Sequence, residues 1–241
     1  MAISSNTLFH FTSKLSTVEA ILLSGGFWPK YCIEYGWKKK FAVSQCCFCD
    51  IPLANIKPHM ETYGNYGIGM TKEWGIRKGI SPVFYVLKNA QITRTLRNIL
   101  SNAKQAGANI KDNEARLISM MKIYEGVNYR FEEGLEQRKQ IKDYKYYNER
   151  EWRFVPELKG RTQIKLIDSE AVFYETKNEL DNTAKGELCT FTPSDVKYIL
   201  VNDMDDRKGV ISSIDKMQYS QEEKDLLKSK IIQSELIKED I

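Results

Sequence analysis

Apolar and polar residues alternate along several short stretches of the chain, and this period of two predicts β-strands. Elsewhere, apolar residues at three- and four-residue spacing predict amphipathic helices. The predicted strands occupy residues 6–12, 41–53, 81–88, 149–155, 162–167 and 197–201. Strands and helices are interspersed, with glycine and proline between them, so we expect a single α+β domain that spans residues 1–241.

Capping signals mark the start of two predicted helices. Ser16 and Glu19 have the spacing of a capping box, and the helix that they begin should end at Gly25. Ser220 and Glu223 have the same spacing near the C-terminus. We therefore expect a helix early in the fold and another that docks on its body at the end.

Residues 91–127 have a different pattern from their surroundings. Ile92, Leu96 and Leu100 recur at helical spacing, and a second amphipathic segment follows Gly107. This pattern predicts a helical hairpin inserted between strands. The charged, tyrosine-rich stretch 128–148 and the polar stretch 176–187 are predicted to be loops.

The composition is that of an ordinary globular protein, with 42% hydrophobic and 28% charged residues. A net charge of +4 is too small to indicate nucleic-acid binding, and the face formed by Arg94, Arg97 and Lys104 is more typical of solvated surface. No run approaches the roughly 20 apolar residues that span a bilayer. The first residues lack a signal-peptide pattern and the five cysteines are odd in number, so we expect a cytoplasmic protein without a membrane segment.

Three cysteines, Cys46, Cys47 and Cys49, lie close together, and His59 follows ten residues later. A structural zinc site normally combines two separated pairs of ligands, whereas adjacent strand residues such as Cys46 and Cys47 point to opposite faces. Buried thiols are the simpler interpretation, and we expect no metal.

The segment EREWRFV, residues 149–155, offers the most specific candidate chemistry. In a strand, Glu149, Glu151 and Arg153 would share one side, while Trp152 and Phe154 would point the other way. The simplest interpretation is a solvated, salt-bridged outer face. The functional alternative is a strand whose two carboxylates face a cleft.

Two features in the first third of the chain could complete such a cleft. His10 lies between two phenylalanines in the first predicted strand, where a hydrogen-bonded structural role and a functional role are both open. The segment YGNYGIGM, residues 63–70, contains three glycines but neither a dinucleotide fingerprint nor a P-loop. It predicts a tight turn before a strand, or a floor that a flat ring approaches closely.

The segments LFHFTSKLSTVEAILLSGGFWPKYCIE, CFCDIPL, HMETYGNYGIGMTKEWG, SPVFYV and EREWRFVPE resemble AbiGi-type abortive phage infection proteins. The likeness covers about the first ninety residues and one later segment. It implies a role in abortive infection beside a second protein from the same defence locus, with this chain as the antitoxin-like member.

A more distant likeness concerns mechanism. The stretch LFHFTSK…VEAILLSGGF is similar to the entry of ADP-ribosyltransferase-like domains of the DarT kind. This likeness implies a split β-sheet core with a helical-hairpin insertion and C-terminal helices, and NAD⁺ as a substrate. It also implies catalytic roles for Glu151 and Glu149, and NAD⁺ contacts from the residues His10, Thr12, Tyr63, Tyr66 and Arg153.

Two classes of function remain open at this point. An enzyme would use NAD⁺ to modify a protein or nucleic acid, and it requires Glu151 and His10 to line one concave pocket. A catalytically inactive antitoxin would restrain a partner protein, and it predicts that Glu151 is sealed by a salt bridge, for example with Arg153.

Overall fold

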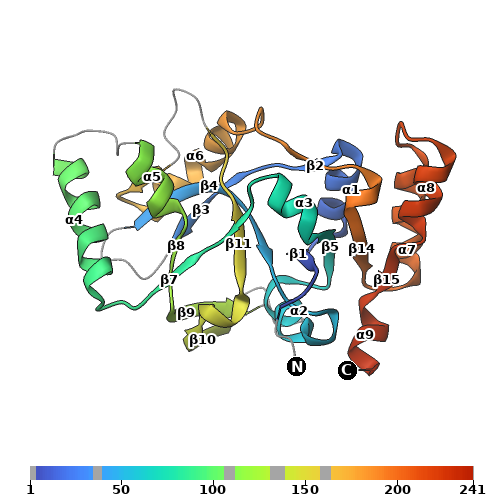
Figure 1. The fold of residues 1–241 in the computed structure, drawn as a ribbon, viewed down its shortest axis with the longest axis horizontal. Coiled ribbons are helices and arrows are strands. Elements are labelled where there is room, and N and C mark those ends of the chain that lie inside the picture. Colours follow the sequence, from blue (N-terminus) through green and yellow to red (C-terminus); the bar gives the residue numbers. More distant parts are fainter. Residues whose placement is uncertain (1–3, 35–39, 106–111, 131–138, 158–163, 241) are drawn as a thin grey trace.

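A computed structural model describes residues 4–34, 40–105, 112–130, 139–157 and 164–240. Its centre is a mixed, mostly antiparallel sheet (Figure 1). The strand order is β15 (Ile231–Gln233), β14 (Val196–Val201), β5 (Tyr66–Thr71), β1 (Thr7–Thr12), β4 (Lys40–Cys49), β11 (Glu151–Phe154) and β6 (Ser81–Pro82). Only β14 and β15 pair in parallel along this path through the described residues.

Strand β4 pairs with different strands along its two halves and so belongs to two parts of the sheet. Its first half pairs with β3 (Lys30–Glu34) and β12 (Ile164–Ile167), and its second half pairs with β11. Its residues are almost continuously buried, as expected for a strand covered on both faces. Shorter strand pairs lie outside this path: β2 (Gly26–Phe27) with β13 (Cys189–Thr190), β7 (Phe84–Val86) with β8 (Met121–Ile123), and β9 (Glu125–Arg130) with β10 (Lys139–Lys145).

The sheet opens between β1 and β4. Strand β1 pairs with β5 along its whole length, from Thr7 to Thr12. In the described chain it pairs with β4 only at Phe9 and Cys49. The side chain of His10 lies where further pairing would continue, and its Nδ1 is 2.8 Å from the carbonyl oxygen of Cys47.

Helices cover both faces of the sheet. One face carries α1 (Leu15–Ser24), α3 (Lys72–Arg77), α7 (Met204–Asp215) and α8 (Gln221–Lys228), which enclose the largest apolar cluster. The other face carries α2 (Lys57–Tyr63) and α9 (Ser234–Asp240), whose Met60 and Ile237 pack against Phe9. At the far end of the molecule, α4 (Gln91–Gln105), α5 (Asp112–Ser119) and α6 (Glu170–Thr183) pack on the region around the first half of β4.

The α+β class is confirmed, while the two predicted loops are largely wrong. Residues 131–138 lie outside the described part, but on either side of them the predicted loop 128–148 contains the end of β9, the whole of β10 and the start of a 3₁₀ turn at Tyr146–Glu149. Most of residues 176–187 belongs to α6, which buries only Phe173 completely and keeps a largely polar surface. These elements bury little apolar surface, so their sequences lack the apolar pattern by which strands and helices are predicted.

Two local predictions also fail. Ser16 does not cap α1, whose N-cap residue is Lys14 without a side-chain cap. Residues 81–88 do not form one strand, since Ser81–Pro82 pairs with β11 and Phe84–Val86 pairs with β8. In contrast, Gly25 ends α1 in a left-handed conformation, and Ser220 and Glu223 form the predicted capping box at α8.

The inserted helices are present as α4 and α5, with residues 106–111 between them outside the described part. The last part of the predicted helical segment, 91–127, is not helical, because Met121–Ile123 forms β8, which pairs with β7, and β9 begins at Glu125. Across the described residues, no helix has both the length and the apolar character needed to cross a bilayer.

Candidate functional site

A cavity of about 150 Å³ lies at the opening between β1 and β4. Aromatic rings form much of its wall, and two histidines, two glutamates and a lysine reach it from five different elements. The aromatic members are Phe9, Phe11, Phe48 and Tyr63, and the polar members are His10, His59, Lys122, Glu149 and Glu151.

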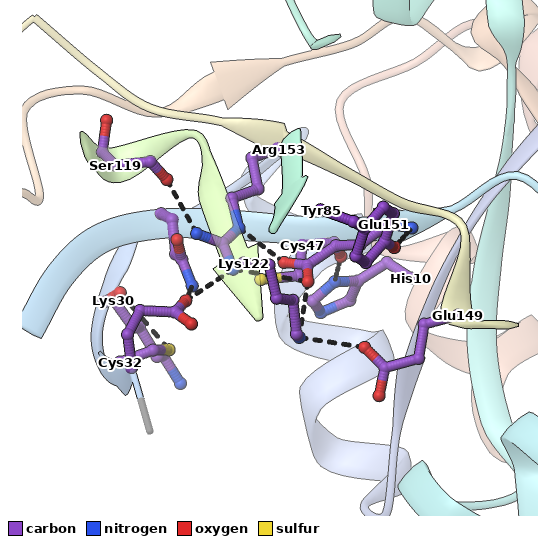
Figure 2. Close-up of polar contacts among 12 residues, drawn as sticks. His10, Lys30, Cys32, Cys47, Tyr85, Ser119, Lys122, Glu149, Glu151 and Arg153 are labelled. Atoms are coloured by element: carbon purple, nitrogen blue, oxygen red, sulfur yellow. Dashed lines mark hydrogen bonds and ion pairs between the residues drawn. The ribbon is translucent and has the colours of Figure 1, made fainter. Parts of the chain in front are cut away.

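Glu151 is the first residue of β11 and lies opposite Cys49 of β4. It is only 4% exposed. Its Oε1 accepts a hydrogen bond from Arg153 Nε at 2.7 Å, and its Oε2 lies 2.5 Å from Lys122 Nζ (Figure 2). Burial alone would raise the pKa of this carboxyl, but Arg153 and Lys122 outweigh it and lower the pKa. Glu151 is therefore ionised at neutral pH.

Glu149 reaches the cavity by a route that the sequence did not predict. It ends a 3₁₀ turn rather than belonging to β11, and Arg150 separates the two with a φ of +48°. This left-handed residue turns the chain so that Glu149 and Glu151 still face the same space (Figure 2). Glu149 accepts a hydrogen bond from the Tyr63 hydroxyl and lies 2.9 Å from Lys122 Nζ.

Lys122 joins the two carboxylates, and sequence analysis missed it. It lies on β8, and its Nζ is 4.8 Å from the centre of the Tyr146 ring. Burial opposes its charge, but Glu149 and Glu151 outweigh this effect and raise the pKa of Lys122 well above its ordinary value. The apolar neighbours Met121 and Ile123 could have indicated a strand with an inward lysine, but the sequence around them was assigned to a helix.

Arg153 is committed to a buried network rather than to the cavity. It is 1% exposed, donates to the carbonyl oxygen of Ser119 at 2.7 Å, and lies 2.5 Å from Glu34 Oε1. Arg153 does not line the cavity, so its expected contact with NAD⁺ finds no support in its position, and its guanidinium instead neutralises buried carboxyl groups. Glu34, which the sequence did not single out, is a third buried carboxylate; burial raises its pKa, and Arg153 opposes that rise.

His10 is a neutral hydrogen-bonding group at the opening of the sheet. Its ring packs against Phe27 and Phe48, with centroid distances of 5.3 and 5.7 Å. Burial lowers its pKa, and the hydrogen bond to the Cys47 carbonyl oxygen only partly offsets this effect. Because a carbonyl can only accept, Nδ1 carries the proton, and Nε2 of the neutral ring is an acceptor.

Two other candidates lie away from the cavity. The Tyr66 hydroxyl donates to Asp206 Oδ2 at 2.9 Å, near the start of α7. Thr12 accepts a bond from the Lys14 amide at 3.4 Å and does not line the cavity. Their predicted contacts with NAD⁺ find no support in the position of either side chain.

The glycines of β5 serve packing between strands. A Cβ atom at Gly67 would lie 2.7 Å from the His10 carbonyl oxygen, and one at Gly69 would lie 2.7 Å from the Phe9 ring. These glycines let β1 approach β5 closely, so the close contact predicted for a flat ligand is made by the protein itself.

The cysteine cluster divides between environments. Cys46 packs in the large apolar core, while Cys47 and Cys49 line the cavity from the other side of β4. Within the described residues, no group of three or more histidine, cysteine, aspartate or glutamate side chains is arranged to hold a metal ion. Burial raises the pKa of all three thiols well above its ordinary value, so they are not activated nucleophiles.

Both features that were to distinguish the two functions occur together. His10 and Glu151 line one cavity, as an enzyme requires. Glu151 is also held by Arg153 and Lys122, as an inactive regulator would have it. Geometry alone therefore leaves an ionised carboxylate that is both cavity-facing and ion-paired.

Comparison with known proteins places this chain in a family. Residues 27–202 match the family model described as "Putative abortive phage resistance protein AbiGi, antitoxin". The chain is 32% identical over 229 residues to the abortive phage resistance protein AbiGi of Lactococcus lactis subsp. cremoris, covering 84% of this chain and 90% of that protein. No solved structure gives a significant match. This chain therefore belongs to the AbiGi family.

Proposed function

We propose that this protein acts in abortive infection against phage and that its central cavity binds NAD⁺ for an ADP-ribosyltransferase-like reaction. The defence role follows from the description of the AbiGi family and from the name of its lactococcal relative. The reaction is proposed from the likeness of the N-terminal segments to ADP-ribosyltransferase-like domains, together with the chemistry of the cavity.

The observation that carries the proposal is the meeting of His10 and Glu151 at one aromatic cavity. A cavity of about 150 Å³ is large enough for a single six-membered ring, since an engineered cavity of about that size binds benzene. It therefore suits the nicotinamide ring and leaves the rest of NAD⁺ outside. The acceptor Nε2 of His10 would bind the carboxamide N–H of that ring.

The buried cluster places an ionised carboxylate at the cavity, and this favours a ligand that becomes positive. Glu151 stays ionised although it is buried, because Arg153 and Lys122 lower its pKa. When the nicotinamide–ribose bond breaks, nicotinamide leaves with the bonding electron pair and positive charge develops on the ribose. An ionised carboxylate beside that carbon stabilises the charge.

Glu151 retains the capacity for this role. A carboxylate has roughly four acceptor positions. Arg153 makes its close contact with Oε1, and Lys122 makes its close contact with Oε2. A ribose hydroxyl would bind at a remaining position. Glu149 would then accept the proton of the attacking group on the protein or nucleic-acid acceptor, with Tyr63 and Lys122 fixing its orientation.

A second function is favoured by the ion pairs themselves. Lys122 and Arg153 hold Glu151 on both oxygens, which is the arrangement expected of a fold that has lost its reaction and acts by binding. The family description includes the word antitoxin. In this alternative, the protein restrains a partner encoded in the same defence locus.

The deciding experiment follows nicotinamide release from NAD⁺ by the purified protein and by Glu151→Gln. Glu157→Gln is the matched control, because the Glu157 side chain is 65% exposed and pairs only with Arg116 among the described residues. Release that Glu151→Gln abolishes and Glu157→Gln preserves would support the enzyme. If NAD⁺ is neither cleaved nor able to shift the melting temperature, the enzyme proposal is wrong. Glu151→Gln should then still neutralise the toxic partner on co-expression.

A further inference from the structure

One polar residue of the cavity wall has no role in the proposed reaction. His59 lies on α2, which packs against β1 and β9, and it is 7% exposed. Neither of its ring nitrogens has a hydrogen-bond partner of good geometry among the described residues. The backbone of Glu149 lies close enough to raise the pKa of His59, but the contact does not have the geometry of a hydrogen bond to either ring nitrogen.

An unpartnered, buried imidazole requires an explanation, because buried polar groups are nearly always hydrogen-bonded. The ring of His59 neighbours those of Phe11 and Tyr63, with both centroids 6.2 Å away. The Tyr63 hydroxyl is already committed to Glu149. His59 therefore brings an unused donor and an unused acceptor to a wall that it shares with four aromatic rings, Phe9, Phe11, Phe48 and Tyr63.

The charge state of His59 defines what it can bind. Burial lowers its pKa to about 4, so the imidazole is neutral near pH 7 and repels no cation. A neutral imidazole donates through one nitrogen and accepts through the other. The two nitrogens point to different sides of the ring, so a ligand edge hydrogen-bonds one of them at a time. A carboxamide or the amide-like edge of a heterocyclic base is a suitable partner, because it carries both an acceptor and a donor and can bind whichever nitrogen faces it.

We propose that His59 is a ligand-binding residue that hydrogen-bonds the amide-like polar edge of a flat ring held between Phe9, Phe11 and Phe48. This inference deepens the proposed function, because nicotinamide is one such ring. It does not depend on NAD⁺ cleavage. A flat ring with an amide-like edge that binds as a free molecule would fit this inference equally well.

The test uses the full chain and four probes: nicotinamide, benzamide, adenine and uracil. Binding is measured by calorimetry, and the ¹⁵N resonances of the His59 ring are followed by NMR as each probe is added. We expect at least one probe to shift the His59 resonances. Its affinity should fall about tenfold in His59→Phe, which keeps an aromatic ring without hydrogen bonds, and should largely return in His59→Gln.

The outcomes separate this inference from the proposed function. Failure of NAD⁺ cleavage together with a probe that shifts His59 and loses affinity in His59→Phe would remove the enzyme and keep the binding residue. Two results would overturn the inference. One is that none of the four probes perturbs the His59 ring, and the other is that every probe that binds does so equally well to the wild type and to His59→Phe.

Discussion

The ammonium group of Lys122 lies 2.5 Å from one oxygen of Glu151 and 2.9 Å from one oxygen of Glu149. This contact connects β8, which follows the inserted helices, with the strand and turn that carry the two carboxylates (Figure 2). The segment that the sequence predicts as an insertion, 91–127, thus contributes Lys122 to the site. Without that lysine, two buried carboxyl groups would line one cavity with no cation between them.

Replacement of Lys122 by methionine should therefore destabilise the protein by about 3–5 kcal/mol, as expected when one partner of a buried ion pair is removed. Loss of the cation removes one of the two charges that lower the folded-state pKa of Glu151, so this pKa is higher in the variant than in the wild type. The wild type therefore gains more stability from ionised Glu151, and this advantage is fully present above the unfolded-state pKa of 4.5 and shrinks as the pH falls below it. The variant should be weaker relative to wild type at pH 8 than at about pH 3.5. Urea unfolding at the two pH values measures this difference.

Lys208→Met is the matched control, because its ion pair with Asp205 is exposed to solvent. It should change the free energy of unfolding by less than about 1 kcal/mol at either pH. An equally small effect of Lys122→Met would show that the three charges do not depend on one another.

The buried His59 should make stability depend on pH. Its pKa is about 4 in the folded protein and 6.5 when exposed, so the unfolded chain binds the proton more strongly. The stabilisation is fully present above pH 6.5 and is lost as the pH falls toward 4. A difference of that size corresponds to about 3 kcal/mol.

Comparison with His59→Gln isolates this contribution, because His10 is retained in both proteins. Between pH 7.5 and 4.5, the free energy of unfolding should fall more steeply for the wild type than for the variant. Parallel curves would mean that the His59 ring is hydrated or paired, with an ordinary pKa.

Two serines test the helix starts. Ser220→Ala removes a cap that accepts the Glu223 amide and should cost about 1 kcal/mol. Ser16→Ala alters a residue with the same sequence signature, but α1 begins at Leu15 without a side-chain cap. It should change stability by less than about 0.5 kcal/mol in thermal unfolding. A cost at Ser16 equal to that at Ser220 would contradict this helix start.

The sequence predicted those elements that are determined by residues close to them in the chain. The glycine at the end of α1, the capping box of α8 and the strands β1, β4, β12 and β14 follow from such signals. Prediction failed where an element gains stability from a distant partner. Strands β6 and β7 lie next to each other in sequence but pair with β11 and β8, and no local pattern records that choice.

The sequence predicted only part of the site, because some of its residues are brought together by pairing between distant strands. Glu149, Glu151, His10 and Tyr63 do meet at one cavity, and the EREWRFV pattern pointed to two of them. Lys122 and Glu34 were missed because a single lysine or glutamate carries no sign of its partner until the strands are in place. His59 was considered only as a metal ligand, since the absence of a hydrogen-bond partner is a property of the folded structure.

Two tyrosines were candidates for contact with NAD⁺, and the structure separates them. The Tyr63 hydroxyl donates to the buried Glu149, whereas the Tyr66 hydroxyl donates to Asp206 outside the cavity. Tyr63→Phe should cost about 2 kcal/mol, because a buried carboxyl group loses a hydrogen-bond partner. Tyr66→Phe should cost about 1 kcal/mol or less, because Asp206 is only partly buried and water can replace the hydroxyl.

If the protein cleaves NAD⁺, nicotinamide release should slow in Tyr63→Phe, where Glu149 is less firmly oriented, and remain unchanged in Tyr66→Phe. Slower release in Tyr66→Phe alone would move the ring-binding site to the side of the sheet that faces α7.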